Sequence, residues 1–137
     1  MTVHAETDSE IIHETEVDFV LRPVSTPIHL VQFDNSLPLI KVNLLKNGRK
    51  FVIPDGMKVY LKFLNAKVGV DNVSFEITEC SEDETAVYFK VTSAMTNLFQ
   101  KTFGVISLKQ GDYEAHSSPL HFIIDVNPYN YLWQNTQ

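Results

Sequence analysis

The sequence predicts an all-β fold: an antiparallel β-sandwich with one short helix and with extended N- and C-terminal arms. Three observations predict it: repeated alternation of apolar and polar residues, turn residues between the alternating runs, and more half-buried strands than one open sheet can cover. Two sheets packed face to face are the usual solution for six or more such strands. The 137 residues suffice for one domain of this kind.

The alternating runs lie at residues 39–46, 57–65, 73–77, 86–91 and 120–126, and a further run at 28–33 has two competing apolar sets. In each of the first five runs, apolar residues occupy every second position, which predicts a strand with one buried face. The residues that we expect in the core are Val59, Leu61, Phe63, Val73, Phe75, Ile77, Val87, Phe89, Val91, Leu98, Phe122 and Ile124.

Turn residues divide the region from 39 to 65 into three consecutive strands. Asn47-Gly48 is a strong hairpin signal, because both residue types tolerate a positive φ. Pro54-Asp55-Gly56 is a second turn signal, and it leaves a short strand at 49–53 between the two. Later, Ala94, Met95, Leu98 and Phe99 recur at helical spacing and predict the short helix, at 93–100.

Charge divides the chain into an acidic N-terminal arm (1–22), a β-sandwich domain (23–127) and an aromatic C-terminal tail (128–137). Residues 1–21 hold six of the 17 acidic residues and no Lys or Arg, whereas the other 11 acidic residues balance the 11 basic ones. We expect the acidic arm to lie outside the folded core, since it has few apolar residues to offset the entropy of ordering. Residues 11–21 are apolar enough to add a strand or to dock on a neighbour.

Several function classes are disfavoured. The body has no basic stripe for nucleic acid, no apolar run is long enough for a membrane helix, and the acidic start is not a signal peptide. Cys80 is the single cysteine, and the five histidines have no metal-ligand spacing. No nucleophile motif, phosphate loop or calcium loop is present, so we expect no enzyme activity, no cofactor and no metal.

The two ends are the candidates for partner binding. Tyr129, Tyr131 and Trp133 alternate, so an extended tail places three rings on one side. These rings either fold back onto their own sandwich or pack against another subunit, where aromatic anchors carry much of the binding energy. The candidate partner-binding residues are Tyr129, Tyr131, Leu132, Trp133, Ile11 and Ile12.

The order of the motifs resembles the amino-terminal domain of the baseplate upper protein of tailed phages that infect Gram-positive bacteria. The motifs are an apolar strand with an Asn-Gly turn, an extended Pro-x-Gly element, a short helix, a strand that begins at glycine, and a final alternating strand. They occupy Leu44–Gly48, Pro54–Phe63, Thr92–Leu98, Gly104–Leu108 and Phe122–Val126, within a resemblance over about residues 24–127.

The resemblance implies a non-enzymatic β-sandwich that docks on a tail, baseplate or fibre hub in the virion, after assembly in the bacterial host cytoplasm. It implies other virion proteins as partners and a homo-oligomer, with a trimer favoured. This chain departs from the family pattern in two ways. It carries an acidic segment ahead of the sandwich, and it stops at Gln137, where such proteins continue into a helical linker and a second domain.

Two alternative functions remain open. A domain with extended ends also suits a head fibre or a capsid decoration or adaptor protein. A carbohydrate- or receptor-binding sandwich is the other alternative, because aromatic rings form platforms for sugars. The rings in question belong to Tyr60, Tyr88, Tyr113, Tyr129, Tyr131 and Trp133.

Overall fold

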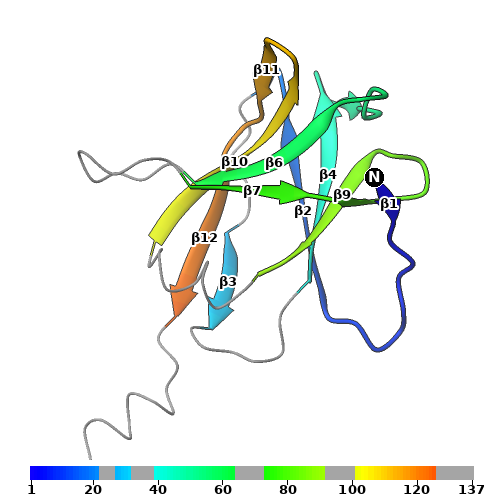
Figure 1. Ribbon diagram of the computed structural model, residues 1–137. Helices are drawn as coiled ribbons and strands as arrows, with labels where there is room; N and C mark the ends of the chain where they lie inside the picture. The colour runs from blue at the N-terminus through cyan, green and yellow to red at the C-terminus, as the bar shows by residue number, and fades with distance from the viewer. Residues whose placement is uncertain (22–26, 32–38, 64–72, 92–100, 126–137) are drawn as a thin grey trace, which may run out of the picture.

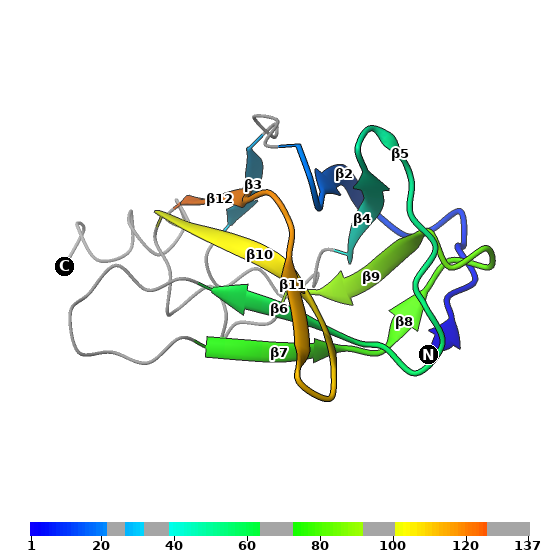
Figure 2. The same ribbon diagram turned by 90° about the horizontal axis from the view of Figure 1, so that it is seen from above.

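The computed structural model describes residues 1–21, 27–31, 39–63, 73–91 and 101–125. Within these ranges the regular structure is entirely β-strand, arranged in two sheets that face each other as a sandwich (Figures 1 and 2). The predicted all-β sandwich is therefore confirmed. The predicted helix at 93–100 and the tail from 128 lie outside the described residues.

The first sheet, sheet A, has the strand order β1-β8-β9-β4-β2, and a short strand β5 pairs with β4 beyond the Asn47-Gly48 turn. Its strands are β1 (Thr2–Val3), β2 (Ile12–Asp18), β4 (Leu39–Lys46), β5 (Arg49–Lys50), β8 (Glu79–Cys80) and β9 (Ala86–Lys90).

Sheet B has the order β3-β12-β10-β6-β7, and β11 pairs with the far end of β10. Its strands are β3 (Ile28–Val31), β6 (Lys58–Phe63), β7 (Val73–Ile77), β10 (Lys101–Gln110), β11 (Tyr113–His116) and β12 (Leu120–Asp125).

Both sheets are mixed, which corrects the prediction of a purely antiparallel sandwich. The first three strands of the chain each join a sheet edge in parallel: β1 on β8, β2 on β4, and β3 on β12. A two-residue hairpin produces only antiparallel neighbours, whereas a parallel neighbour needs a longer connection. Turn signals in the sequence detect hairpins, so they could not reveal these three pairings.

The N-terminal segment is a structural part of the sandwich. Strand β2 pairs with β4 over its whole length, and Val17 is fully buried in the core. The prediction that residues 1–22 lie outside the folded core is therefore wrong for residues 12–18, because alternation lets Glu14 and Glu16 stay exposed while Val17 points inward. The alternative that residues 11–21 add a strand is confirmed.

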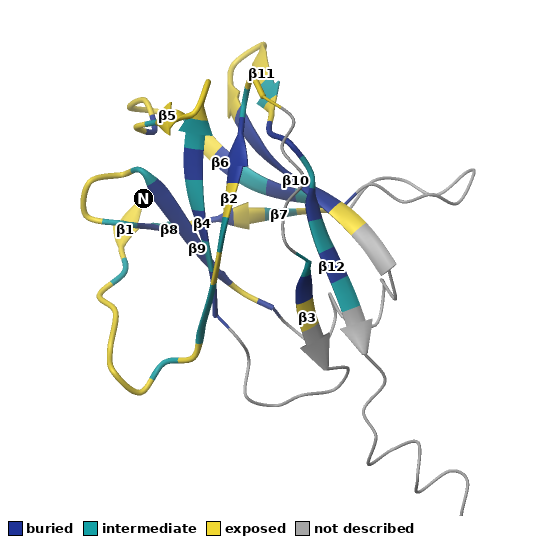
Figure 3. Ribbon diagram, turned by 180° about the vertical axis from the view of Figure 1, so that it is seen from behind, coloured by how far each residue is buried: buried dark blue, intermediate teal, exposed yellow. Residues whose placement is uncertain are grey.

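The core between the sheets contains most of the residues that alternation predicts (Figure 3). Phe75 is half-buried at the core margin, and the side chains at 73, 98 and 124 lie outside the described part of the chain. The predicted core residues that are buried are Val59, Leu61, Phe63, Ile77, Val87, Phe89, Val91 and Phe122.

The turn between β4 and β5 has positive φ at both central residues, 54° at Asn47 and 80° at Gly48. Two successive positive φ angles define a type I′ hairpin turn, which the Asn-Gly sequence predicts. Gly56 follows with φ of 78° in the second predicted turn, where the Met57 N–H donates to the Pro54 carbonyl at 3.2 Å. Both turn predictions are confirmed.

Asp18 holds this hairpin turn against the end of β2. Its buried carboxylate accepts four backbone N–H bonds: from Val20 and Leu21 at 2.8 Å, from Asn47 at 3.0 Å and from Gly48 at 2.8 Å. Burial by itself raises the pKa of Asp18, but the four N–H donors outweigh it and lower the pKa from 3.8 to about 2. The carboxylate is therefore ionised in the folded protein at neutral and mildly acidic pH.

Two adjacent serines link the sheets at the same corner. The Ser117 N–H donates to the Ile106 carbonyl of β10 at 2.9 Å, and the Ile106 N–H donates to Ser117 Oγ at 2.9 Å. Ser118 makes the equivalent pair with Asp18: its N–H donates to the Asp18 carbonyl at 2.8 Å, and its Oγ accepts from the Asp18 N–H at 3.0 Å. Hydrogen bonds thus join sheet B to the edge strand of sheet A.

We predict that Asp18→Asn lowers the free energy of unfolding at neutral pH. The variant should also lose less stability than the wild type when the pH is lowered to 2.5. An amide has one acceptor oxygen and cannot accept four N–H bonds, so some of these donors lose their partner. Since the folded pKa is depressed, the wild-type contribution is complete above the ordinary pKa of 3.8 and is lost as the pH falls toward 2. Urea unfolding at pH 7 and at pH 2.5 measures both effects.

The exposed Asp55→Asn serves as the matched control, because Asp55 lies at the Pro54 turn and outside this hydrogen-bond set. It should leave the urea midpoint at pH 7 unchanged. An Asp18→Asn protein with the wild-type midpoint at both pH values would contradict the role given to Asp18.

Candidate functional site

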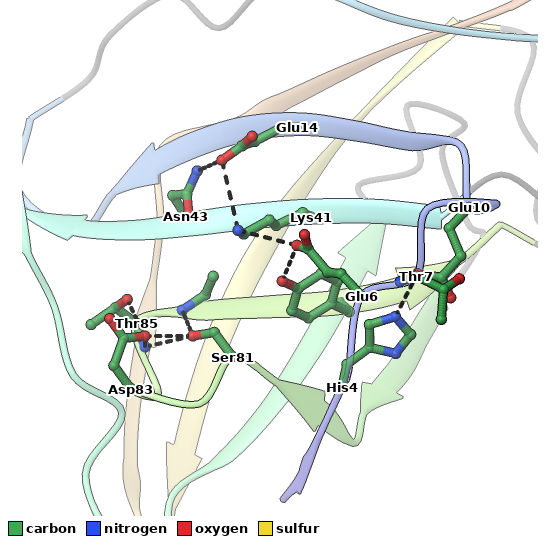
Figure 4. A network of polar contacts seen from close by, with 12 residues as sticks. His4, Glu6, Thr7, Glu10, Glu14, Lys41, Asn43, Ser81, Asp83 and Thr85 are labelled. Atoms are coloured by element: carbon green, nitrogen blue, oxygen red, sulfur yellow. Dashed lines mark hydrogen bonds and ion pairs between the residues drawn. The ribbon is translucent and has the colours of Figure 1, made fainter.

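The first ten residues, which we call the strap, lie against the edge and the outer face of sheet A (Figure 4). The backbone N–H of Thr2 donates to the Thr78 carbonyl, and that of His4 donates to the Cys80 carbonyl, each at 2.9 Å. The strap then passes over the outer face of the sheet to reach β2. Its side chains therefore cover a surface that the sandwich would otherwise expose.

His4 is one of two strap side chains that contact this face. Its ring lies 4.7 Å from the Tyr88 ring, between centroids, and its side chain is only 11% exposed. Nε2 lies 3.1 Å from a Glu10 carboxylate oxygen, and Nδ1 lies 3.6 Å from one of Glu79. The hydrogen bond to Glu10 raises the pKa of His4 above 6.5; burial opposes this, and the Glu10 and Glu79 charges add to it.

Glu6 makes the second set of contacts. The Tyr88 hydroxyl donates to its carboxylate, and Lys41 Nζ lies 3.3 Å from the same carboxylate oxygen and 5.6 Å from the Tyr88 ring centroid. The hydrogen bond from Tyr88, followed by that from Lys41, lowers the pKa of Glu6. Tyr88 is consequently only 3% exposed, so it presents no open ring to a ligand.

A polar groove of about 420 Å³ adjoins the strap on the same face. At one end, Asp83 accepts hydrogen bonds from the Ser81 and Thr85 hydroxyls at 2.7 and 2.8 Å; with the Thr85 N–H they lower the pKa of Asp83 to about 2. The residues that line the groove are Glu14, Glu16, Lys41, Asn43, Leu44, Leu45, Lys50, Ser81, Asp83, Thr85 and Ala86. No aromatic ring is among these described residues, so the groove lacks the stacking platform typical of sugar sites.

The outer face of sheet B contains a Ser–His–Glu arrangement that the sequence analysis missed. His116 Nδ1 lies 2.6 Å from Ser107 Oγ, and His116 Nε2 lies 3.6 Å from Glu114, which also contacts Lys62. Cross-strand pairing of Ser107 with His116 brings them together, and local spacing gives no sign of it. Ser107 is fully buried, so no substrate could reach its hydroxyl and the set is better explained as a structural contact.

The structure places only part of the predicted partner-binding set. Ile11 is 70% exposed immediately before β2, and Ile12 is half-buried at its start. Tyr129, Tyr131, Leu132 and Trp133 lie outside the described residues. The role of both groups stays a prediction.

Cys80 and the metal-binding residue types are the other chemical groups to consider among the described residues. Cys80 is buried, and this burial raises the pKa of its thiol, so the reactive thiolate is suppressed. The described residues hold no group of three or more His, Cys, Asp or Glu side chains arranged to bind a metal. Nor do they form a helix that could cross a membrane.

We predict that Glu10→Gln lowers the pKa of His4. The Glu10 carboxylate is the largest cause of the raised pKa, and a neutral amide removes its charge. Because the folded pKa is raised, this pair stabilises the docked strap fully below pH 6.5 and loses its effect as the pH rises through the folded pKa. NMR titration of the His4 ring measures the midpoint in wild type and variant.

Glu82→Gln, at the exposed tip between β8 and β9, is the matched control and should leave the His4 midpoint in place. Identical midpoints in wild type and Glu10→Gln would mean that His4 is not held by Glu10 in solution.

The comparison with known proteins gives a solved structure of similar fold. No protein-family model matches the chain, and no curated protein sequence matches it. Among solved structures, the chain is similar to the N-terminal domain of phage TP901-1 ORF48, with a TM-score of 0.69 and 11% sequence identity. The match covers 84% of this chain and 98% of that domain. The chain therefore has the fold of the N-terminal domain of phage TP901-1 ORF48.

Proposed function

We propose that the protein is a non-enzymatic structural component of a phage particle, a docking and assembly module of the baseplate or tail-fibre type. The observation that carries this proposal is the fold likeness to a phage protein domain, which is matched over 98% of its length. The order of sequence motifs supports the same conclusion independently, since it resembles the baseplate upper protein family.

Exposed apolar side chains held in fixed positions support a docking role. Val20 and Leu21 are 53% and 47% exposed, although their backbone N–H groups are both bound to the buried Asp18 carboxylate. Apolar groups on a backbone that is already ordered bind a partner with little further loss of entropy. On sheet B, Phe103 is 51% exposed and stacks on His121 at 4.6 Å. Large rings of this kind are enriched at protein interfaces.

The partners in this proposal are other virion proteins and further copies of the chain. We assign contacts to the exposed Ile11 and its neighbour Ile12, and to the aromatic tail with Tyr129, Tyr131, Leu132 and Trp133. A trimer is the oligomer that the family resemblance favours. In this arrangement the ends and surfaces of the sandwich perform the function, and no pocket is required.

Two other functions have some support. A head fibre or decoration protein needs the same kind of sandwich and differs only in its place in the particle. A carbohydrate-binding sandwich is favoured by the polar groove of about 420 Å³ on sheet A, with its carboxylates, Asn43 and Lys41. The covered ring of Tyr88 makes this less favourable than docking, because sugars bind best on open aromatic faces.

Gold-labelled antibody against this chain, applied to purified particles and viewed by electron microscopy, tests the proposed function. We expect label at the end of the tail. Label on the head would replace the baseplate proposal with the head-fibre alternative. Particles without label, and without the chain by mass spectrometry, would contradict a virion role altogether. A glycan array with the native protein tests the sugar-binding alternative separately.

We predict that deletion of residues 129–137 leaves the sandwich folded but reduces its incorporation into particles at least severalfold. The tail holds three large rings, which together could bury several hundred Å² against a partner. Light scattering, thermal melting and particle composition are the measurements. A triple Tyr129→Ser, Tyr131→Ser, Trp133→Ser variant keeps the chain length and should behave in the same way. Full incorporation with a lowered melting temperature would assign the rings to their own sandwich.

A further inference from the structure

The strap is attached to the sandwich as a separable element. Its backbone contributes only the two-residue strand β1, and its first residues Met1 and Val3 are each 53% exposed. None of residues 1–10 belongs to the buried core cluster. The sandwich therefore does not require its own strap for its packing.

The surface beneath the strap is an acceptor with specific features. The edge of β8 supplies the Thr78 and Cys80 carbonyls, and the outer face supplies Tyr88, Lys41 and the Glu79 carboxylate. An uncovered strand edge of this kind recruits another strand. Any chain segment with the sequence of the strap is complementary to this acceptor.

The connection between the strap contacts and β2 has the form of a hinge. Thr7, Asp8 and Ser9 are exposed and form a turn, closed by the Glu10 N–H to the Thr7 carbonyl at 3.2 Å and by the Thr7 N–H to the Glu10 carboxylate at 3.3 Å. If this turn opens, Glu6 and Glu10 can separate by about 14 Å, since an extended chain spans about 3.5 Å per residue. Residues 1–6 can then leave the sandwich to which Glu10 belongs.

We propose that the first part of the strap, residues 1–6, is exchanged between two copies of this chain and occupies the β8 edge and the Tyr88 face of the other copy. With the hinge at residues 7–9, Glu10 stays with the accepting copy and contacts the incoming His4. Every contact of the closed strap is then remade between copies, apart from the local turn. Exchange of an identical element is a low-cost route to a homo-oligomer.

This inference rests on the proposed function for its setting in an assembled particle, but its chemistry needs only two copies of the chain. The contact between His4 Nε2 and the Glu10 carboxylate, at 3.1 Å, is compatible with both the closed and the exchanged arrangement. That contact survives exchange, since it joins the two sides of the hinge.

A disulfide test distinguishes exchange from closure within one chain. Val3 is the register partner of Cys80, and adjacent strands lie about 4.8 Å apart, within disulfide range. One chain carries Val3→Cys and Cys80→Ala, so it holds no internal partner for the new thiol. It is mixed at high concentration with size-tagged wild-type chain and mildly oxidised. We expect a covalent dimer of the two chains that reductant separates.

The matched control is Thr2→Cys with Cys80→Ala. Thr2 is the register partner of Glu79 and its side chain leaves the strand on the opposite face from Val3, so we expect at least tenfold less mixed dimer. A single Val3→Cys chain, with Cys80 kept, verifies that the bond can form within one molecule. An internal bond in this variant, together with no mixed dimer at any concentration, would overturn the proposal.

A second readout does not depend on thiols. His4→Ala with Glu6→Ala removes the side-chain contacts to Glu79, Tyr88 and Lys41, and we expect native mass measurement to show a shift from oligomer toward monomer. An unchanged oligomer would count against exchange. Particle labelling is independent of both experiments, so a chain that is found in the virion without exchanging its strap would sink this inference and leave the proposed function intact.

Discussion

The carboxylate of Asp18 is the interaction on which the rest of the sandwich depends. It lies where the end of β2, the type I′ turn at Asn47-Gly48 and the Ser117-Ser118 segment meet, and it accepts four backbone N–H bonds. Backbone N–H groups need hydrogen-bond partners, and here one buried side chain supplies them for four N–H groups. The neighbouring bonds from Ser118 to Asp18 and from Ser117 to Ile106 continue this contact across the gap between the sheets. Apolar side chains fill the space between the sheets, and this polar corner holds the two sheets in place relative to each other.

The acidic character of the N-terminal segment is compatible with a structural role because each carboxylate has its own environment. Asp18 is buried and fully hydrogen-bonded, whereas Glu6 and Glu14 lie on the outer face beside Lys41 and Asn43. The same segment therefore supplies an edge strand, a polar cover for sheet A and the exposed Ile11. A net charge of −6 thus describes a surface and its contacts, and it does not mark an unfolded arm.

Much of the fold follows from local patterns, and the rest depends on contacts between distant residues. Alternation placed Val59, Leu61 and Phe122 correctly in the core, and the Asn47-Gly48 pair predicted its turn. The role of Asp18 could not be predicted, because its partners Gly48 and Ser118 are 30 and 100 residues away along the chain. The contact of His4 with Tyr88 was missed for the same reason. The contact of Ser107 with His116, nine residues apart, was missed because it depends on the register between β10 and β11. Parallel edges leave no turn signature, so the mixed topology was also beyond local inference.

The parallel pairing of β3 with β12 has a consequence during protein synthesis. Residue 28 is made 94 residues before its partner at 122, and Asp18 is made 100 residues before its partner Ser118. At 5–20 residues per second, the first strands wait about 5–20 s for the segments that complete their sheets. Apolar strands without partners tend to aggregate, and flanking charges suppress this. The six carboxylates among residues 1–21 supply such charges, so we expect the acidity that covers the finished sandwich to protect the nascent chain as well while it waits.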